Sequence, residues 1–138
     1  MPLLINRGIL LTRRGDVQAA EKALAAALAK TPANEPDAAA AYYAMGRLKM
    51  DTGQLQSAAG YFQAALKADQ VAGFYAGMAD DLQMLGDAHS RLGEPDAALD
   101  YWKRSVRIYA LIGNGRETET VMKKLQAAGT GANLELIE

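Results

Sequence analysis

Three segments of the chain repeat one pattern of small and large residues, and this repeat restricts the possible folds more than any other sequence feature. Each copy begins with a glycine, followed at steps of seven, five, four and three residues by a second glycine, an alanine, a large apolar residue and a small residue. The copies are Gly8, Gly15, Ala20, Leu24 and Ala27; Gly46, Gly53, Ala58, Phe62 and Ala65; and Gly86, Gly93, Ala98, Trp102 and Ser105. They start 38 and then 40 residues apart (46 − 8 and 86 − 46). A repeat of this length is typical of folds that stack one structural unit on the next.

Each copy predicts a helix, a tight turn and a second helix. The second glycine of each copy (Gly15, Gly53 and Gly93) suits the left-handed backbone conformation that ends a helix. Pro95 then suits the first turn of the next helix. Half of the residues are apolar and only 7% are aromatic, and the chain is rich in alanine, the best helix former. The composition therefore agrees with an all-α fold.

The small residues of each copy predict where the two helices cross. A first-helix glycine pairs with a second-helix alanine in each copy: Gly8 with Ala20, Gly46 with Ala58, and Gly86 with Ala98. Larger side chains at these sites would push the helices apart. The next large residue, Leu24, Phe62 or Trp102, is expected to fill the space beside the crossing.

The pattern predicts seven helices in one domain over residues 1–129. We expect these helices near 3–14, 17–30, 36–52, 55–69, 72–92, 95–112 and 115–128. We expect the repeats over about 1–34, 37–72 and 73–113, a capping helix over 114–128, and a flexible tail over 130–138, which has no periodicity. Asn114 and Glu117 have the spacing of a capping box for the seventh helix.

The chain resembles the tetratricopeptide repeat family over roughly residues 1–128. The paired helices, the spacing of their small residues and Pro32 at the end of the first copy carry this resemblance. The 40-residue step and the stretch 109–114 resemble the variant of this repeat with longer helices. The resemblance implies a right-handed α-solenoid of three helix-turn-helix repeats and a C-terminal capping helix. The sequence departs from the family at Arg7, where an apolar residue is usual, and at Lys49 and His89, where an aromatic residue is usual.

Charge and composition argue against several classes of partner and site. The formal net charge is −1, which gives no electrostatic reason to expect nucleic acid or an anionic membrane surface. The chain has no cysteine and a single histidine, so thiolate and multi-histidine metal sites are excluded within one chain. No stretch approaches the roughly 20 apolar residues that span a bilayer. We expect a cytoplasmic protein without metal or cofactor, unless the sequence is part of a larger exported protein.

Candidate catalytic residues are few and poorly placed. His89 could act as a general base, but it falls on a helix face expected to pack between repeats. Asp80 and Asp87 share a helix face, yet they lie about 10 Å apart along the axis, too far to share a metal ion. No nucleophile, base and orienting partner can be assembled, so we expect a scaffold rather than an enzyme.

The resemblance implies a concave groove formed by the first helix of each repeat. Its predicted residues are Tyr43, Arg47, Met50, Asp51, Asp80, Gln83, Asp87, Arg91 and, from the capping helix, Lys123. Such a mixed polar surface with an aromatic residue suits an extended peptide or a partner helix. We therefore expect a protein or peptide ligand.

The first helix predicts an alternative function, self-association into a homodimer or larger assembly. Its apolar residues, among them Leu3, Ile5 and Ile9, are distributed most of the way around the helix. A terminal helix can bury only about one side against its neighbours, so the other side needs a partner. The alternatives are a preceding repeat, a fixed partner, or a first turn that frays and leaves its apolar residues exposed. Since the chain begins with methionine, we expect self-association.

Overall fold

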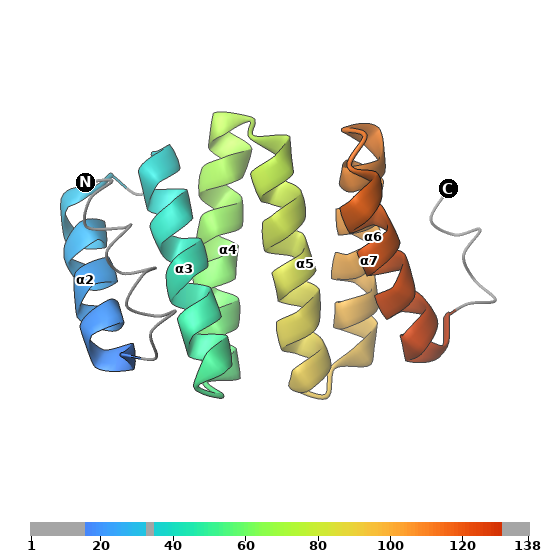
Figure 1. Cartoon of the computed structure of the whole chain (residues 1–138), viewed down its shortest axis with the longest axis horizontal. Coiled ribbons are helices and arrows are strands. Elements are labelled where there is room, and N and C mark those ends of the chain that lie inside the picture. Colours follow the sequence, from blue (N-terminus) through green and yellow to red (C-terminus); the bar gives the residue numbers. More distant parts are fainter. Residues whose placement is uncertain (1–15, 33–34, 131–138) are drawn as a thin grey trace. The chain divides into compact units, whose positions relative to one another are not determined.

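A computed structural model describes residues 16–32 and 35–130, and in these ranges the chain forms helices joined by short turns, with no β-strand (Figure 1). The α-helices are α2 (Val17–Lys30), α3 (Pro36–Asp51), α4 (Leu55–Ala72), α5 (Tyr75–Arg91), α6 (Pro95–Leu111) and α7 (Gly115–Leu125). A short π-helix, η1 (Gln126–Thr130), comes after α7. The predicted helix over 3–14, with Leu3, Ile5 and Ile9, and the predicted tail after Thr130 lie outside the described residues.

Two predicted helix boundaries were wrong by about three residues. The fourth helix runs on to Ala72 instead of ending near residue 69, and α5 begins at Tyr75 instead of residue 72. Gly73 causes the difference, because it adopts a φ of +68° and ends α4 at that point. The α-helix α7 ends at Leu125, but the chain stays helical in η1 up to Gly129, which agrees with the predicted end near residue 128.

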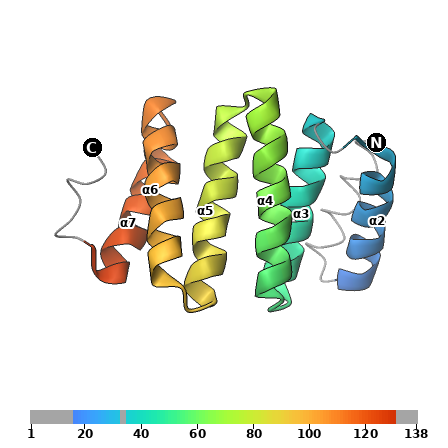
Figure 2. The same ribbon diagram turned by 180° about the vertical axis from the view of Figure 1, so that it is seen from behind.

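The chain divides into two compact units, each with its own helical hairpin (Figures 1 and 2). Unit 1 covers Met1–Gly73, and in it α3 packs against both α2 and α4. Unit 2 covers Phe74–Glu138, and in it α6 packs against both α5 and α7. The sequential packing of neighbouring helices confirms the predicted all-α repeat architecture within each unit.

Each hairpin places a glycine of its first helix against a large ring of its second helix. A methyl group added at Gly46 would lie 2.6 Å from an atom of the Phe62 ring. At Gly86 it would collide with the Trp102 indole. Ala58 and Ala98, predicted at the crossings, are 0% and 1% exposed. These contacts confirm the small-and-large pairing predicted for the second and third copies.

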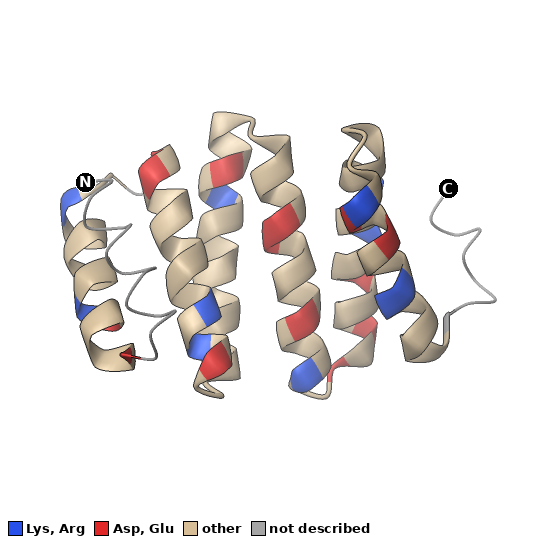
Figure 3. Ribbon diagram, in the orientation of Figure 1, with Lys and Arg blue, Asp and Glu red and all other residues tan. Residues whose placement is uncertain are grey.

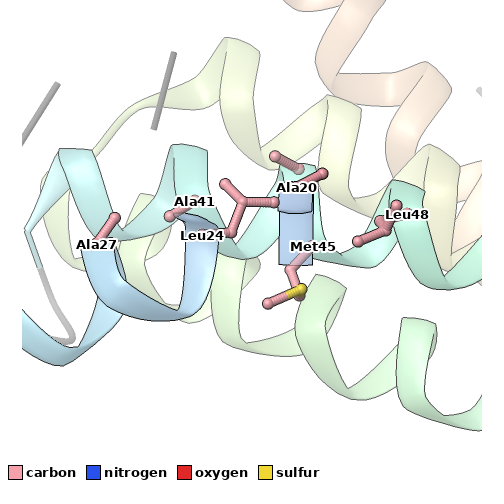
Figure 4. Packing of buried hydrophobic residues seen from close by; sticks show 7 residues of the cluster. Ala20, Leu24, Ala27, Ala41, Met45 and Leu48 are labelled. Atoms are coloured by element: carbon pink, nitrogen blue, oxygen red, sulfur yellow. The ribbon is translucent and has the colours of Figure 1, made fainter. Parts of the chain in front are cut away.

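The core of unit 1 joins α2 to α3 through small side chains (Figure 4). Its buried residues are Ala20, Leu24, Ala27, Ala41, Ala44, Met45 and Leu48. Beside them, the Lys49 amino group lies 2.6 Å from a Glu21 carboxylate oxygen, and Lys49 is 8% exposed. A lysine is accommodated at this usually aromatic site because α2 supplies a carboxylate for its charge.

Three helices end in the same hydrogen-bonded turn. Gly53, Gly93 and Gly113 have φ values of +77°, +79° and +77°. The residue after each glycine donates its N–H to the carbonyl five residues earlier: Gln54 to Lys49, Glu94 to His89, and Asn114 to Tyr109. This pairing is the Schellman motif, which satisfies the last carbonyls of a helix. It confirms the predicted turns at Gly53 and Gly93, whereas Gly15 lies outside the described residues.

Candidate functional site

One line of residues on α3 is accessible to solvent, and we name it the α3 stripe: Ala40, Tyr43, Arg47 and Asp51. Ala40, Arg47 and Asp51 are exposed, and Tyr43 is partly buried. Their spacing of three, four and four residues places them along one face of the helix. Most other residues between Ala38 and Asp51 are buried, with Tyr42 the one further exception. Of the predicted groove residues, Tyr43, Arg47 and Asp51 belong to this stripe.

The two adjacent tyrosines of α3 contact different aromatic residues of α4. Tyr43 approaches Phe62 edge-on, with ring centroids 5.6 Å apart. Tyr42 lies against Tyr61 at 6.5 Å. Because Phe62 also fills the space beside Gly46, it supports Tyr43 from a fixed position in the hairpin. Tyr43 therefore offers a braced ring that remains partly open to solvent.

The charged residues of α3 gather in its last turns, apart from Asp37 in the first turn (Figure 3). Lys49 is neutralised by Glu21 of α2. Arg47 and Asp51 are exposed, and neither side chain forms a hydrogen bond or an ion pair with any residue that the structure describes. Their charges are thus available to a ligand.

Met50, predicted for the same surface, is 6% exposed and does not belong to the α3 stripe. It comes seven residues after Tyr43 and so lies only about 20° from it around the helix. The direction of its side chain around the helix therefore does not by itself account for its burial. The described structure thus offers an aromatic ring and two charges on α3, without the methionine.

Three of the predicted groove residues of α5, Asp80, Gln83 and Asp87, are held by side chains from α6 and α7. The Lys124 amino group donates hydrogen bonds to both carboxylate oxygens of Asp87, at 2.9 Å each, and to the side-chain oxygen of Gln83 at 2.8 Å. The Trp102 indole N–H donates to the same Asp87 carboxylate at 3.1 Å. Asp87 and Gln83 are therefore engaged within unit 2.

A second part of this network surrounds the Tyr109 hydroxyl. The hydroxyl donates to the Asp80 carboxylate and accepts from the Gln83 amide at 3.0 Å. The same amide donates to the Glu117 carboxylate, also at 3.0 Å. Burial, together with the hydrogen bond and negative charge of Asp80, raises the pKa of Tyr109 well above its ordinary value. Tyr109 is thus a neutral donor at neutral pH.

Glu117 shows why only half of the predicted capping box forms. The Asn114 side chain accepts from the Glu117 N–H at 3.1 Å, as predicted. The Asn114 N–H, however, already donates to the Tyr109 carbonyl in the turn that ends α6. The Glu117 carboxylate binds the Gln83 amide instead.

The sequence interpretation missed Lys124 and Glu117 as partners of α5. They are seven residues apart, which places them on one face of α7, and they have charges suited to the polar residues of α5. This spacing and these charges are the sequence features from which the two partners could have been predicted. The neighbouring Lys123, predicted for the groove, is exposed and pairs with Glu119 at 3.3 Å within α7. Arg91 is exposed at the end of α5.

The His89 side chain packs against an aromatic residue of α6. Its ring stacks on Tyr101 with centroids 5.2 Å apart, and Arg104 lies 5.5 Å from the centroid of the Tyr101 ring. Its Nδ1 is 3.6 Å from a Glu94 carboxylate oxygen.

In the part of the chain that the structure describes, no cluster of three or more histidine, aspartate or glutamate residues could hold a metal ion. Within the same part, no helix is both long enough and apolar enough to cross a membrane.

Comparison with known proteins gave a match to a protein family. The tetratricopeptide repeat profile matches residues 37–110, which is 74 of the 138 residues (110 − 37 + 1) and so more than half of the chain. The match covers most of α3 to α6, the helices of both hairpins. A search among curated proteins found no match.

Proposed function

The chain belongs to the tetratricopeptide repeat family, whose domains are generally protein–protein interaction modules, and we propose that it binds a peptide or a partner helix on the α3 stripe. Domains of this family are typically non-catalytic, and no catalytic family matched the chain. We accordingly propose a binding function without catalysis.

The observation that carries this proposal is the contrast between the first helices of the two hairpins. On α3, Arg47 and Asp51 are exposed and unengaged among the described residues. On α5, Gln83 and Asp87 are bound by Lys124. A ligand can pair with the charges of α3 directly, whereas on α5 it would first have to displace an internal ion pair. This contrast favours α3 as the binding helix.

Tyr43 supplies the second argument for the α3 stripe. Tyrosine is enriched at binding hot spots, because it gives a large contact area and loses little conformational freedom on binding. The contact with Phe62 already restricts the Tyr43 ring, so part of the entropy cost of ordering it is met before a ligand arrives.

A peptide selection tests the proposal. Peptides selected on the immobilised chain are expected to bind at least tenfold more weakly to a Tyr43→Ala/Arg47→Ala variant. The matched control is Tyr75→Ala/Lys67→Ala, which removes the same kinds of side chain from exposed sites elsewhere. Thermal unfolding checks that each variant is folded, and Arg47→Ala alone, at an exposed site, gives a second reading. Peptides that bind all variants equally would show that the ligand site is not on the α3 stripe.

A further inference from the structure

We infer that the ligand of the α3 stripe is an extended peptide segment with an apolar side chain, an acidic side chain two residues away, and a basic side chain a further two residues away. This inference rests on the function proposed above and adds the chemistry of the ligand. Its basis is the order in which the stripe presents a braced ring, a positive charge and a negative charge.

The apolar contact belongs to the first half of the stripe. Ala40 is exposed and lies three residues before Tyr43, so a methyl group and a partly open aromatic ring stand side by side on the helix surface. Neither presents a charge, and the small Ala40 leaves room beside the ring. An aliphatic or aromatic ligand side chain would bury apolar surface there, which favours binding because that surface is removed from water.

The two charges determine the chemistry of the other two ligand side chains. Arg47 is the cation of α3 that the described residues leave unpaired, since Glu21 already neutralises Lys49. A guanidinium binds a carboxylate through two parallel hydrogen bonds. Asp51 is the last residue of α3, and its negative charge adds to the partial negative charge at the helix C-terminus. A basic ligand side chain is therefore favoured at Asp51, and an acidic one would be repelled.

The spacing of the stripe matches an extended peptide. Tyr43, Arg47 and Asp51 are separated by four residues each, or about 6 Å along the helix axis. In an extended peptide, side chains on the same face occur at every second residue, about 6.6 Å apart. Alternate ligand residues can therefore contact successive positions of the stripe. The acidic residue is central in either chain direction, so the order of chemistry does not depend on orientation.

A charge-exchange variant tests this inference on the full chain. A library of end-blocked peptides with five central positions randomised is selected on the wild-type chain and on Arg47→Glu/Asp51→Lys. The variant conserves net charge and changes only exposed positions. We expect the wild type to enrich peptides with a central acidic residue between an apolar and a basic one. The variant should enrich the reversed charges, and each peptide class should bind its own protein at least tenfold more tightly than the other.

The possible outcomes separate this inference from the proposed function. If both proteins enrich the same peptides and Tyr43→Ala weakens their binding, the α3 stripe binds peptides but the inferred ligand chemistry is wrong. If the charges reverse but at a spacing of four residues, the ligand is a helix and the extended form is wrong. If enrichment is absent, or insensitive to Tyr43→Ala and to the charge exchange, the proposed function on α3 and the inference both fail.

Discussion

At the scale of single residues, small side chains allow the paired helices to approach closely. In unit 2, Ala98 is 1% exposed and belongs to the same buried cluster as Trp102 and Val106. A close-packed interior has little space for additional methylene groups. The size of the residue at this position therefore affects the whole hairpin.

Replacing Ala98 with leucine is expected to lower the free energy of unfolding by about 1–3 kcal/mol through overpacking. The matched control is Ala110→Leu on the same helix, where the residue is exposed and the change should remain within about 0.5 kcal/mol. Urea unfolding measures both. Equal stability of Ala98→Leu and the parent chain would contradict the crossing assigned to Ala98.

Tyr109 gives a second prediction at this scale, a pH dependence. Because its pKa is raised in the folded state, the unfolded chain loses the tyrosine proton first, above about pH 10. Its contribution to stability is complete below that pH and is lost as the pH rises, by up to about 1.4 kcal/mol for each pH unit. Tyr109→Phe should reduce this alkaline slope.

The control for Tyr109→Phe is Tyr75→Phe, because Tyr75 is 61% exposed. Urea unfolding between pH 8 and pH 11 compares the two variants with the parent chain. At neutral pH, Tyr109→Phe should also cost about 1–3 kcal/mol, since Asp80 and Gln83 lose a buried partner. An unchanged alkaline slope in Tyr109→Phe would show that another group dominates it.

At the scale of helices, α7 is held on unit 2 by two kinds of contact. Val121 and Leu125 are fully buried in the core of the unit. Lys124 and Glu117 connect α7 to the polar residues of α5. The core residues supply apolar burial, while the polar pair matches specific positions of α5. Both the burial and the orientation of α7 therefore depend on contacts that are distant in sequence.

Two neighbouring lysines of α7 should respond differently to the same substitution. Lys124→Met keeps the aliphatic stem but removes the ammonium group that donates to Asp87 and Gln83, and leaves Asp87 with the Trp102 indole as donor. We expect the free energy of unfolding to fall by about 1–3 kcal/mol. Lys123→Met removes an exposed pair with Glu119 and should change stability by less than about 1 kcal/mol. Hydrogen exchange should show faster opening of α7 in Lys124→Met. Equal effects of the two substitutions would contradict the described role of Lys124.

At the scale of the whole molecule, each unit contains its own core and its own hairpin with a glycine against an aromatic ring. The repeat pattern also predicts a first helix near residues 3–14, which would precede α2. The single domain over 1–129, the right-handed sense of the solenoid and self-association through this helix stay predictions. Of these three predictions, self-association is the one that concerns the function of the protein.

Substituting Ile5 and Ile9 with lysine is expected to lower the mass measured by light scattering. Charged side chains on an association surface would oppose burial, and each large apolar side chain left in water costs about 1.5–3 kcal/mol relative to its burial. Lys22→Ala, at an exposed site of α2, is the control and should leave the mass unchanged. A parent chain that is already monomeric at high micromolar concentration would rule out the homodimer.

The features predicted correctly from the sequence are the local and repeated ones. The turns at Gly53 and Gly93, the cap at Asn114 and the pairing of Gly46 with Phe62 depend on neighbouring residues or on a spacing that recurs. Each copy of the repeat shows the same spacing again, because each hairpin has to end its first helix and pack its two helices closely. For this reason the helical repeat could be read without any tertiary information.

Only the tertiary structure decided which of the predicted groove positions remain open. Asp87 and Gln83 are occupied by Lys124, 37 and 41 residues further along the chain, and Met50 is buried. Arg47 and Tyr43 occupy the equivalent positions of the second copy, 40 residues earlier, yet Arg47 is exposed and Tyr43 is only partly buried. Repeat spacing places a residue on a helix face, but the side chains that neighbouring helices bring to that face determine whether a ligand can reach it.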